Sequence, residues 1–346
     1  MKKILTTGIA CAAAIAALAG PAYGQAKTEF SLAWSIYVGW MPWGYAADAG
    51  IVDKWADKYG ISIDVERLDY VPSIEQFSSG AYDAVTATNM DILDIAGFLG
   101  LDTTALIIGD YSNGNDVVLT RDGAPLESIQ GAEVNMVELS VSEYLMDRAI
   151  EMNGLDDAVT VNTSDADMAA VWYAGGTDAV VTWNPIVAEL IDTGTATNVF
   201  DSSMIPGEIL DMTNVNSAVL ADNPDFGKAL VGAWYETMAL MAAGDAEALE
   251  YMAVESGTDL DGYNLQLNST EMFYDGVGAV DIMNSDELKM TMERVHNWLN
   301  TTYPADLLSP EPVGIEYADG STSGEAGNIM LRFDPSFMQM YINGTL

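Results

Sequence analysis

Nine side chains that could recognise a small molecule follow predicted strands, at the points where strand turns into loop or helix. In open α/β sheets, ligands bind outside the carboxyl ends of the strands, so these positions are where a site is expected. They supply aromatic rings, carboxylates, amides and the hydroxyls of a tyrosine and a serine. The nine candidates are Tyr37, Trp40, Asn89, Asp91, Asp110, Glu138, Ser140, Trp183 and Asn184.

The loops that carry these residues contain no lysine or arginine. Nitrate and sulfonates need basic residues or well-aimed N–H groups, whereas carboxylates accept paired N–H bonds from a planar cation, and an aromatic face adds cation–π attraction. The loops therefore favour a guanidinium-like ligand, with neutral urea second. Because the whole chain has 12 Lys and Arg against 52 Asp and Glu, the lack of basic residues is a weaker signal than in a balanced sequence.

Each candidate also has a structural interpretation. An aromatic ring such as Trp40 can fill the core, and Asn89 is placed to cap a helix. Asp110 suits turn chemistry at a hinge, and Glu138 can be a solvated acid in a first helical turn. The set as a whole, rather than any one member, predicts the site.

Catalytic chemistry has little support in the sequence. His296 is the only histidine, and no Gly-x-Ser-x-Gly, phosphate-loop or Gly-x-Gly-x-x-Gly motif occurs. The segment 259–262 begins like a calcium loop but lacks the EF-hand spacing and its final glutamate. We therefore expect no catalytic residue, no metal and no cofactor.

Alternating strands and helices position the candidates. Apolar stretches bounded by turn residues alternate with helical patterns, which predicts the α/β class with mostly parallel strands covered by helices. The predicted strands are 30–36, 61–68, 84–88, 104–108, 134–137, 159–162 and 179–182.

The polar stretch 110–116 reads as a place where the chain leaves one lobe for another, and 214–220 reads as its return. We therefore divide the mature chain into a first part of lobe 1 (25–112), lobe 2 (113–216), and a second part of lobe 1 with C-terminal helices (217–346).

Several local features are specific enough to test. Residues 43–59 should form a helix interrupted near Gly50, and Ser73 should cap a helix over 73–79. A helix is expected over 269–283, and the Gly/Ser-rich segment 314–327 should be loose.

Residues 1–24 have the form of a secretory signal peptide: basic Lys2 and Lys3, an uncharged apolar run over 4–19, and small residues before Gln25. The run is shorter than the roughly 20 apolar residues of a spanning helix. Cys11, the only cysteine, lies inside it without the leucine of a lipobox. We expect cleavage near Gln25 and a periplasmic mature protein.

The formal net charge is −40. Such a surface repels nucleic acid, so a nucleic-acid partner is not expected. The acids are spread through a chain that is 49% hydrophobic, which indicates a folded protein with an acidic surface rather than a disordered tail. We interpret that surface as a halophilic adaptation, because counter-ions screen the repulsion in salty surroundings.

Residues 45–54 contain Ala46, Gly50 and Ile51 in an Ala-x-x-x-Gly-Ile pattern followed by Val52, and residues 73–84 match the next helix and strand of the same group. These motifs resemble the nitrate/sulfonate/taurine-type ABC transporter periplasmic substrate-binding proteins, which prefer Phe at the position of Val52. The segments 88–91, 109–116 with 134–144, and 162–165 with 182–185 resemble the subgroup encoded beside urea carboxylases.

The resemblance implies a two-lobed periplasmic binding protein fold of type II, with two crossovers and a ligand cleft between the lobes. It implies a monomer that binds a small molecule, here urea or guanidine, and delivers it to an ABC permease in the inner membrane. It also leaves taurine, sulfonate or nitrate open as ligands. Pyrimidine-forming enzymes of thiamine biosynthesis share this fold, but they are intracellular and use histidine and cysteine chemistry, which the signal peptide and composition oppose.

Overall fold

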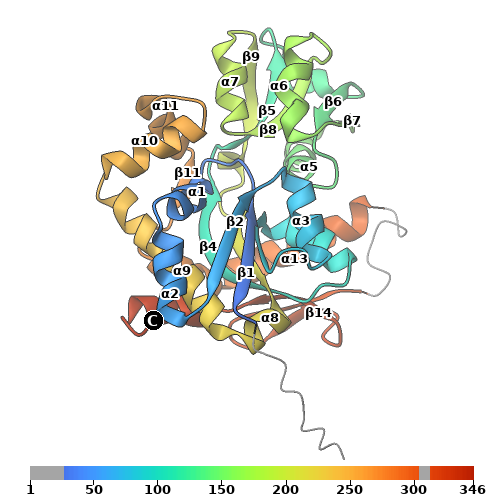
Figure 1. The fold of residues 1–346 in the computed structure, drawn as a ribbon. Coiled ribbons are helices and arrows are strands. Elements are labelled where there is room, and N and C mark those ends of the chain that lie inside the picture. Colours follow the sequence, from blue (N-terminus) through green and yellow to red (C-terminus); the bar gives the residue numbers. More distant parts are fainter. Residues whose placement is uncertain (1–26, 304–311) are drawn as a thin grey trace, which may run out of the picture.

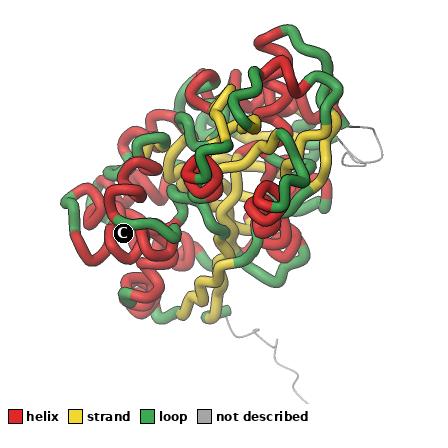
Figure 2. The backbone as a smooth tube through the Cα atoms, turned by 90° about the horizontal axis from the view of Figure 1, so that it is seen from above, coloured by secondary structure: helices red, strands yellow, loops and turns green. Residues whose placement is uncertain are grey.

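The computed structural model describes residues 27–303 and 312–346, so the expected signal peptide, 1–24, lies outside the described residues. Two β-sheets form the centres of two lobes, and Figure 1 shows the smaller lobe above the larger one. In the view from above, the helices lie around the strands (Figure 2). The two-lobed α/β class expected from the sequence is thus confirmed.

The larger sheet runs β13-β12-β14-β4-β10-β3-β1-β2, with β11 added beside β4. Strand β1 is parallel to β2 and β3, whereas β10 is antiparallel to both β3 and β4. The strands of this sheet are β1 (Glu29–Trp34), β2 (Ser62–Arg67), β3 (Ala84–Thr88), β4 (Thr103–Ser112), β10 (Leu210–Asn216), β11 (Thr270–Met272), β12 (Gly314–Glu316), β13 (Thr322–Gly324) and β14 (Ile329–Phe333).

The smaller sheet runs β7-β6-β8-β5-β9. Every residue of its central strand β8 is buried, in keeping with the continuous apolar run of a strand covered on both faces. Its strands are β5 (Asp116–Arg121), β6 (Glu133–Met136), β7 (Val159–Asn162), β8 (Ala179–Trp183) and β9 (Ala196–Asp201).

The chain passes between the sheets twice, from β4 to β5 and from β9 to β10. The sequence assigned 113–216 to lobe 2, but β10 already pairs with β3 and β4 in the larger sheet. The return therefore precedes Leu210, and that boundary was placed too late. The apolar pattern of β10 does not indicate that this strand joins the larger sheet antiparallel to β3 and β4.

Helices cover both sheets. Gly50, with φ 72°, separates α1 from α2, as the sequence predicted, because a left-handed backbone suits glycine. The helices are α1 (Met41–Asp48), α2 (Ile51–Tyr59), α3 (Tyr70–Ser78), α4 (Asn89–Asp91), the π-helix η1 (Ile92–Ala96), the 3₁₀ turns η2 (Leu126–Ile129) and η3 (Ser202–Met204), α5 (Val141–Asn153), α6 (Asp165–Tyr173), α7 (Ile186–Asp192), α8 (Ser217–Asp222), α9 (Pro224–Ala242), α10 (Ala246–Glu255), α11 (Leu260–Leu267), α12 (Val277–Met283), α13 (Asp286–Thr302) and α14 (Ser336–Ile342).

Three local expectations were wrong. Helix α3 begins at Tyr70 with Asp69 as N-cap, and the Ser73 hydroxyl instead donates to the Tyr70 carbonyl. A strand, β11, occupies the start of the segment predicted as a helix over 269–283, because it adds to the edge of β4. The segment 314–327 contains the β12–β13 pair rather than a loose loop.

No helix of the described residues is long and apolar enough to span a bilayer.

Candidate functional site

A small cavity lies between the lobes. Its volume is about 10 Å³, which is room for about one water molecule. The small lobe contributes the first residue of β5, the first of α5 and the last of β8, and the large lobe contributes the rest. The lining residues are Tyr37, Trp40, Tyr70, Thr88, Asp116, Val141, Trp183 and Asp211.

Four buried aromatic rings form a continuous wall of this cavity. Tyr37 meets Trp40 edge-on at 5.0 Å between ring centroids, Trp40 lies 5.6 Å from Tyr70, and Tyr70 meets Trp183 edge-on at 5.5 Å. The Trp183 indole also donates to the carbonyl of Ile36 at 2.9 Å, which joins the small lobe to the large one. A ligand in this cavity would therefore contact aromatic rings.

Four buried aspartates lie at or next to this cavity: Asp116 and Asp211 line it, and Asp110 and Asp91 are hydrogen-bonded to the lining residues Tyr37 and Tyr70. Burial raises the pKa of Asp91 to about 7, that of Asp110 to about 7 and that of Asp116 to about 6. Burial and the neighbouring Asp110 carboxyl raise the pKa of Asp211 well above its usual range. Within 27–303 and 312–346, none of the four forms an ion pair.

Two carboxylate oxygens of this group accept no hydrogen bond from an N–H or hydroxyl group of the described residues. They are Oδ2 of Asp110 and Oδ2 of Asp211, and both are buried. A buried acceptor without a donor is costly. Each of these oxygens could still accept a hydrogen bond, and of the two residues only Asp211 lines the cavity.

The strands explain why Asp110 and Asp211 meet. Antiparallel β4 and β10 place Asp110 directly opposite Asp211, and a register shift leaves Gly109 unpaired between Asp110 and Ile108. Such a bulge changes the direction of the neighbouring side chain. The Tyr37 hydroxyl donates to Asp110 Oδ1 at 3.0 Å and completes the cluster.

Asp91 lies behind the aromatic wall and does not line the cavity. Its Oδ2 accepts the Tyr70 hydroxyl at 2.6 Å and the backbone N–H of Val141 at 3.2 Å. Because Tyr70 belongs to the large lobe and Val141 to the small lobe, this carboxylate holds the two lobes together.

Three other candidates serve the local structure and do not line the cavity. Asn89 accepts from the N–H of Leu210 at 2.9 Å and donates to the carbonyl of Glu208, and the expected N-cap role falls to Thr88 instead. Ser140 caps α5 by accepting from the Ser142 N–H at 3.2 Å. Asn184 accepts from the N–H of Ala188 at 3.0 Å.

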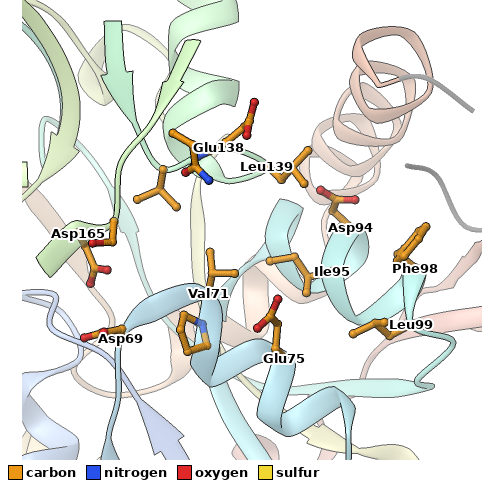
Figure 3. A pocket seen from close by; sticks show the side chains of 14 residues that line it. Asp69, Val71, Glu75, Asp94, Ile95, Phe98, Leu99, Glu138, Leu139 and Asp165 are labelled. Atoms are coloured by element: carbon orange, nitrogen blue, oxygen red, sulfur yellow. The ribbon is translucent and has the colours of Figure 1, made fainter. Parts of the chain in front are cut away.

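Glu138 lies in a separate groove of about 490 Å³ on the outside of the lobe junction. Figure 3 shows Asp69, Glu75, Asp94, Glu138 and Asp165 around an apolar floor. Glu138 is exposed and does not reach the cavity.

Of the nine predicted residues, Tyr37, Trp40 and Trp183 line the cavity and Asp91 and Asp110 stand behind its wall. Sequence reasoning missed Tyr70, Asp116 and Asp211. The sequence carried one usable signal, since Asp211 interrupts the apolar run 209–212. Tyr70 had no signal, because it precedes Pro72 in what reads as a loop.

In the described part of the chain, no group of three or more His, Cys, Asp and Glu side chains is placed to hold a metal ion.

No family model matches the chain, and no curated protein matches it. Several solved structures are similar to this chain.

The alkanesulfonate-binding protein SsuA from Xanthomonas axonopodis pv. citri, bound to MOPS, is similar with a TM-score of 0.67 and 14% identity, over 83% of this chain and 96% of that one. The nitrate-binding protein NrtA from Synechocystis PCC 6803 has a TM-score of 0.56 and 15% identity, over 92% and 99%. A Candida albicans protein with the generic periplasmic binding protein fold has a TM-score of 0.62 and 12% identity, over 81% and 92%.

This chain has the periplasmic binding protein fold. At these identities the likeness concerns the fold alone. The cavity lined by Tyr37, Trp40 and Trp183 is one of the spaces between its two lobes. The ligand has to be inferred from the side chains of this chain.

Proposed function

We propose that this protein is the periplasmic solute-binding component of an ABC importer and that it captures a small planar cation of the guanidinium type between its lobes. The proposal depends on one observation: two buried aspartates without an ion pair in the described chain, Asp116 and Asp211, line a cavity walled by aromatic rings, and a third, Asp110, lies directly beside Asp211. Neutral urea is the second candidate. The similar sulfonate- and nitrate-binding structures support the transport role.

Charge favours a cation over the anions named for those structures. Nitrate or a sulfonate placed in this cavity would face Asp116 and Asp211 directly, with Asp110 behind Tyr37. A planar cation instead donates N–H groups to the free Oδ2 atoms of Asp110 and Asp211 and lies against an aromatic face. Such hydrogen bonds contribute about 1.5–3 kcal/mol each, and a desolvated cation–π contact contributes about 2 kcal/mol.

Size limits the affinity. Small ligands gain at most about 1.5 kcal/mol per non-hydrogen atom, so a ligand of guanidinium size gains about 6 kcal/mol. That corresponds to a dissociation constant of roughly tens of micromolar. The cavity of about 10 Å³ must widen to admit a ligand of four non-hydrogen atoms, because it has room for about one water molecule. Hinge motion between lobes supplies that change.

A binding role is favoured over an enzymatic one of the same fold. The residues that line the cavity include neither histidine nor cysteine, on which the pyrimidine-forming enzymes depend. His296 borders a different, small cavity beside Leu299 and Val313.

Calorimetry of the mature protein with guanidinium chloride, urea, taurine and sodium nitrate tests the proposal, with sodium chloride as the salt control. We expect guanidinium to bind with a dissociation constant of roughly tens of micromolar, urea to bind more weakly, and the two anions not to bind. Binding of nitrate or taurine with no response to guanidinium or urea would overturn the ligand and leave the transport role. Loss of the protein from its own cells should reduce uptake of labelled guanidine, and unchanged uptake would contradict the transport role.

A further inference from the structure

Two acids face one another directly inside the larger sheet. Asp110 of β4 is the cross-strand partner of Asp211 of β10, and their exposed fractions are 0% and 2%. Like charges directly opposite in a sheet destabilise it. Burial strengthens the repulsion, because little water remains to screen it. Two ionised carboxylates cannot be the resting state of this pair without a compensating positive charge.

No such charge comes from the surroundings. Tyr37 donates its hydroxyl to Asp110, Asp116 approaches from β5, and Tyr263 and Tyr274 approach from α11 and the segment after β11. The neighbouring strands place Thr88 opposite Asp211 and Met272 opposite Asp110. Neither carboxylate makes an ion pair with a lysine, arginine or histidine of the described chain.

We propose that Asp110 and Asp211 form a carboxyl–carboxylate pair that holds one proton in the ligand-free protein and releases it when a planar cation binds, so that this pair selects the charge of the ligand. The inference rests on the proposed function, since it concerns the same cavity. The exchange is balanced: one O–H bond breaks, its proton passes to solvent or buffer, and the N–H groups of one monocation take its place. Asp116, whose pKa burial raises to about 6, also lines the cavity and is ionised above that pH.

Two further observations agree with a retained proton. The carboxyl groups of Asp110 and Asp211 lie within hydrogen-bonding reach of each other. Burial raises the pKa of Asp110 to about 7, and the pKa of Asp211 lies well above its usual range.

The pair distinguishes a cation from a neutral analogue by its response to pH. Guanidinium must displace a proton, so its affinity should rise about tenfold per pH unit as the pH increases towards the pKa of the pair, and then level off. Urea carries no charge and displaces none, so its affinity should not follow pH in this way. The ratio of the two affinities therefore increases with pH.

Calorimetry at pH 8 in phosphate and in Tris buffers measures the proton directly, because the two buffers differ in their enthalpy of ionisation. At this pH Asp110 and Asp116 are mostly ionised, so the pair holds one proton. For guanidinium chloride we expect an apparent enthalpy difference equivalent to about one released proton, and for urea none. Asp211→Asn keeps the shape but cannot supply the proton, so the release and the pH dependence should both disappear. Asp57→Asn, on the exposed surface of α2, should retain both. Equal enthalpies in the two buffers, or release retained in Asp211→Asn, would overturn the proposal.

A second measurement needs no ligand. Because the folded protein holds a proton that the unfolded chain loses above about pH 4, the stability of the ligand-free protein should fall as the pH rises from 5 to 8, and it should fall less in Asp211→Asn. If Asp211→Asn does not fold, Asp110→Asn can replace it in this measurement. If this difference is present but guanidinium does not bind, the acid pair stands and the proposed ligand is wrong. If guanidinium binds and both proteins follow the same pH profile, the acid pair is wrong and the ligand stands.

Discussion

Replacing Asp91 by alanine should weaken ligand binding by loosening the closure of the lobes. The Asp91 carboxylate accepts the Tyr70 hydroxyl at 2.6 Å within the large lobe and the Val141 N–H at 3.2 Å from the small lobe. Its side chain is 1% exposed and does not line the cavity. Opening the lobes breaks the contact with Val141, whereas the contact with Tyr70 can persist.

The magnitude follows from the contact that opening breaks. At pH 8 Asp91, whose pKa is raised to about 7, is mostly ionised. A hydrogen bond to a charged group contributes about 1.5–3 kcal/mol, so the closed form should lose that amount relative to the open form. The dissociation constant then rises roughly 10–150-fold. Since Val141 and Asp91 make this bond without the ligand, guanidinium and urea should lose affinity by the same factor. Asp91→Asn keeps an acceptor for Val141 and should lose less.

Stopped-flow binding and calorimetry with both ligands measure this effect, which should appear mainly as faster release. Asp94→Ala is the matched control, because Asp94 lies in the adjoining π-helix and its carboxylate accepts no hydrogen bond from the described residues. A loss for guanidinium without a loss for urea would show that Asp91 acts as a charge partner. An unchanged affinity for both ligands would refute the closure role.

Three further outcomes are expected. Gly39→Ala should lower the free energy of unfolding by about 1–3 kcal/mol, because the added Cβ would lie 2.4 Å from Asp110 Oδ2. The control is Gly97→Ala, whose added Cβ would lie 3.7 Å from its nearest neighbour and which should leave the stability measured by calorimetry unchanged or raise it. Glu138→Ala should change the guanidinium dissociation constant by less than about twofold, and a larger loss in calorimetry would place the outer groove in the binding path. The association rate for a cation should fall with added salt, as surface charges are screened beyond about 10 Å at 0.1 M, while the release rate stays constant; a salt-dependent release rate would contradict a buried charge site.

The fold could be predicted because its signals are local. Apolar strands alternate with helical patterns, and Gly50 marks the break between α1 and α2. Cap assignments were less accurate, because several neighbouring residues can cap a helix and distant partners decide among them. Asn89 is an example: its amide is engaged by Glu208 and Leu210, so Thr88 caps α4.

The site could be predicted only in part, because its members meet through strand pairing that the sequence does not specify. Tyr37 and Trp40 follow β1, Trp183 ends β8, and all three were recognisable as aromatic residues at the ends of predicted strands. Asp211 enters through β10, which runs antiparallel between β3 and β4 in a sheet that the sequence suggested to be mostly parallel. Without that pairing, nothing brings Asp211 to Asp110 across the hundred residues between them.

The acidic composition made the two buried aspartates of the candidate site, Asp110 and Asp211, hard to recognise from the sequence. Most of the 52 Asp and Glu lie where water and salt can screen them, so a further acid on the surface carries little information. An aspartate inside a buried strand has a different energetic status, since its charge costs stability unless a proton or a cation compensates it. We expect Asp110 and Asp211 to lower the stability of the empty protein for this reason, and we propose that a cation that supplies N–H donors to both would restore it. The protein should therefore be more stable with its ligand than without it, by an amount that the pairing of these two residues determines.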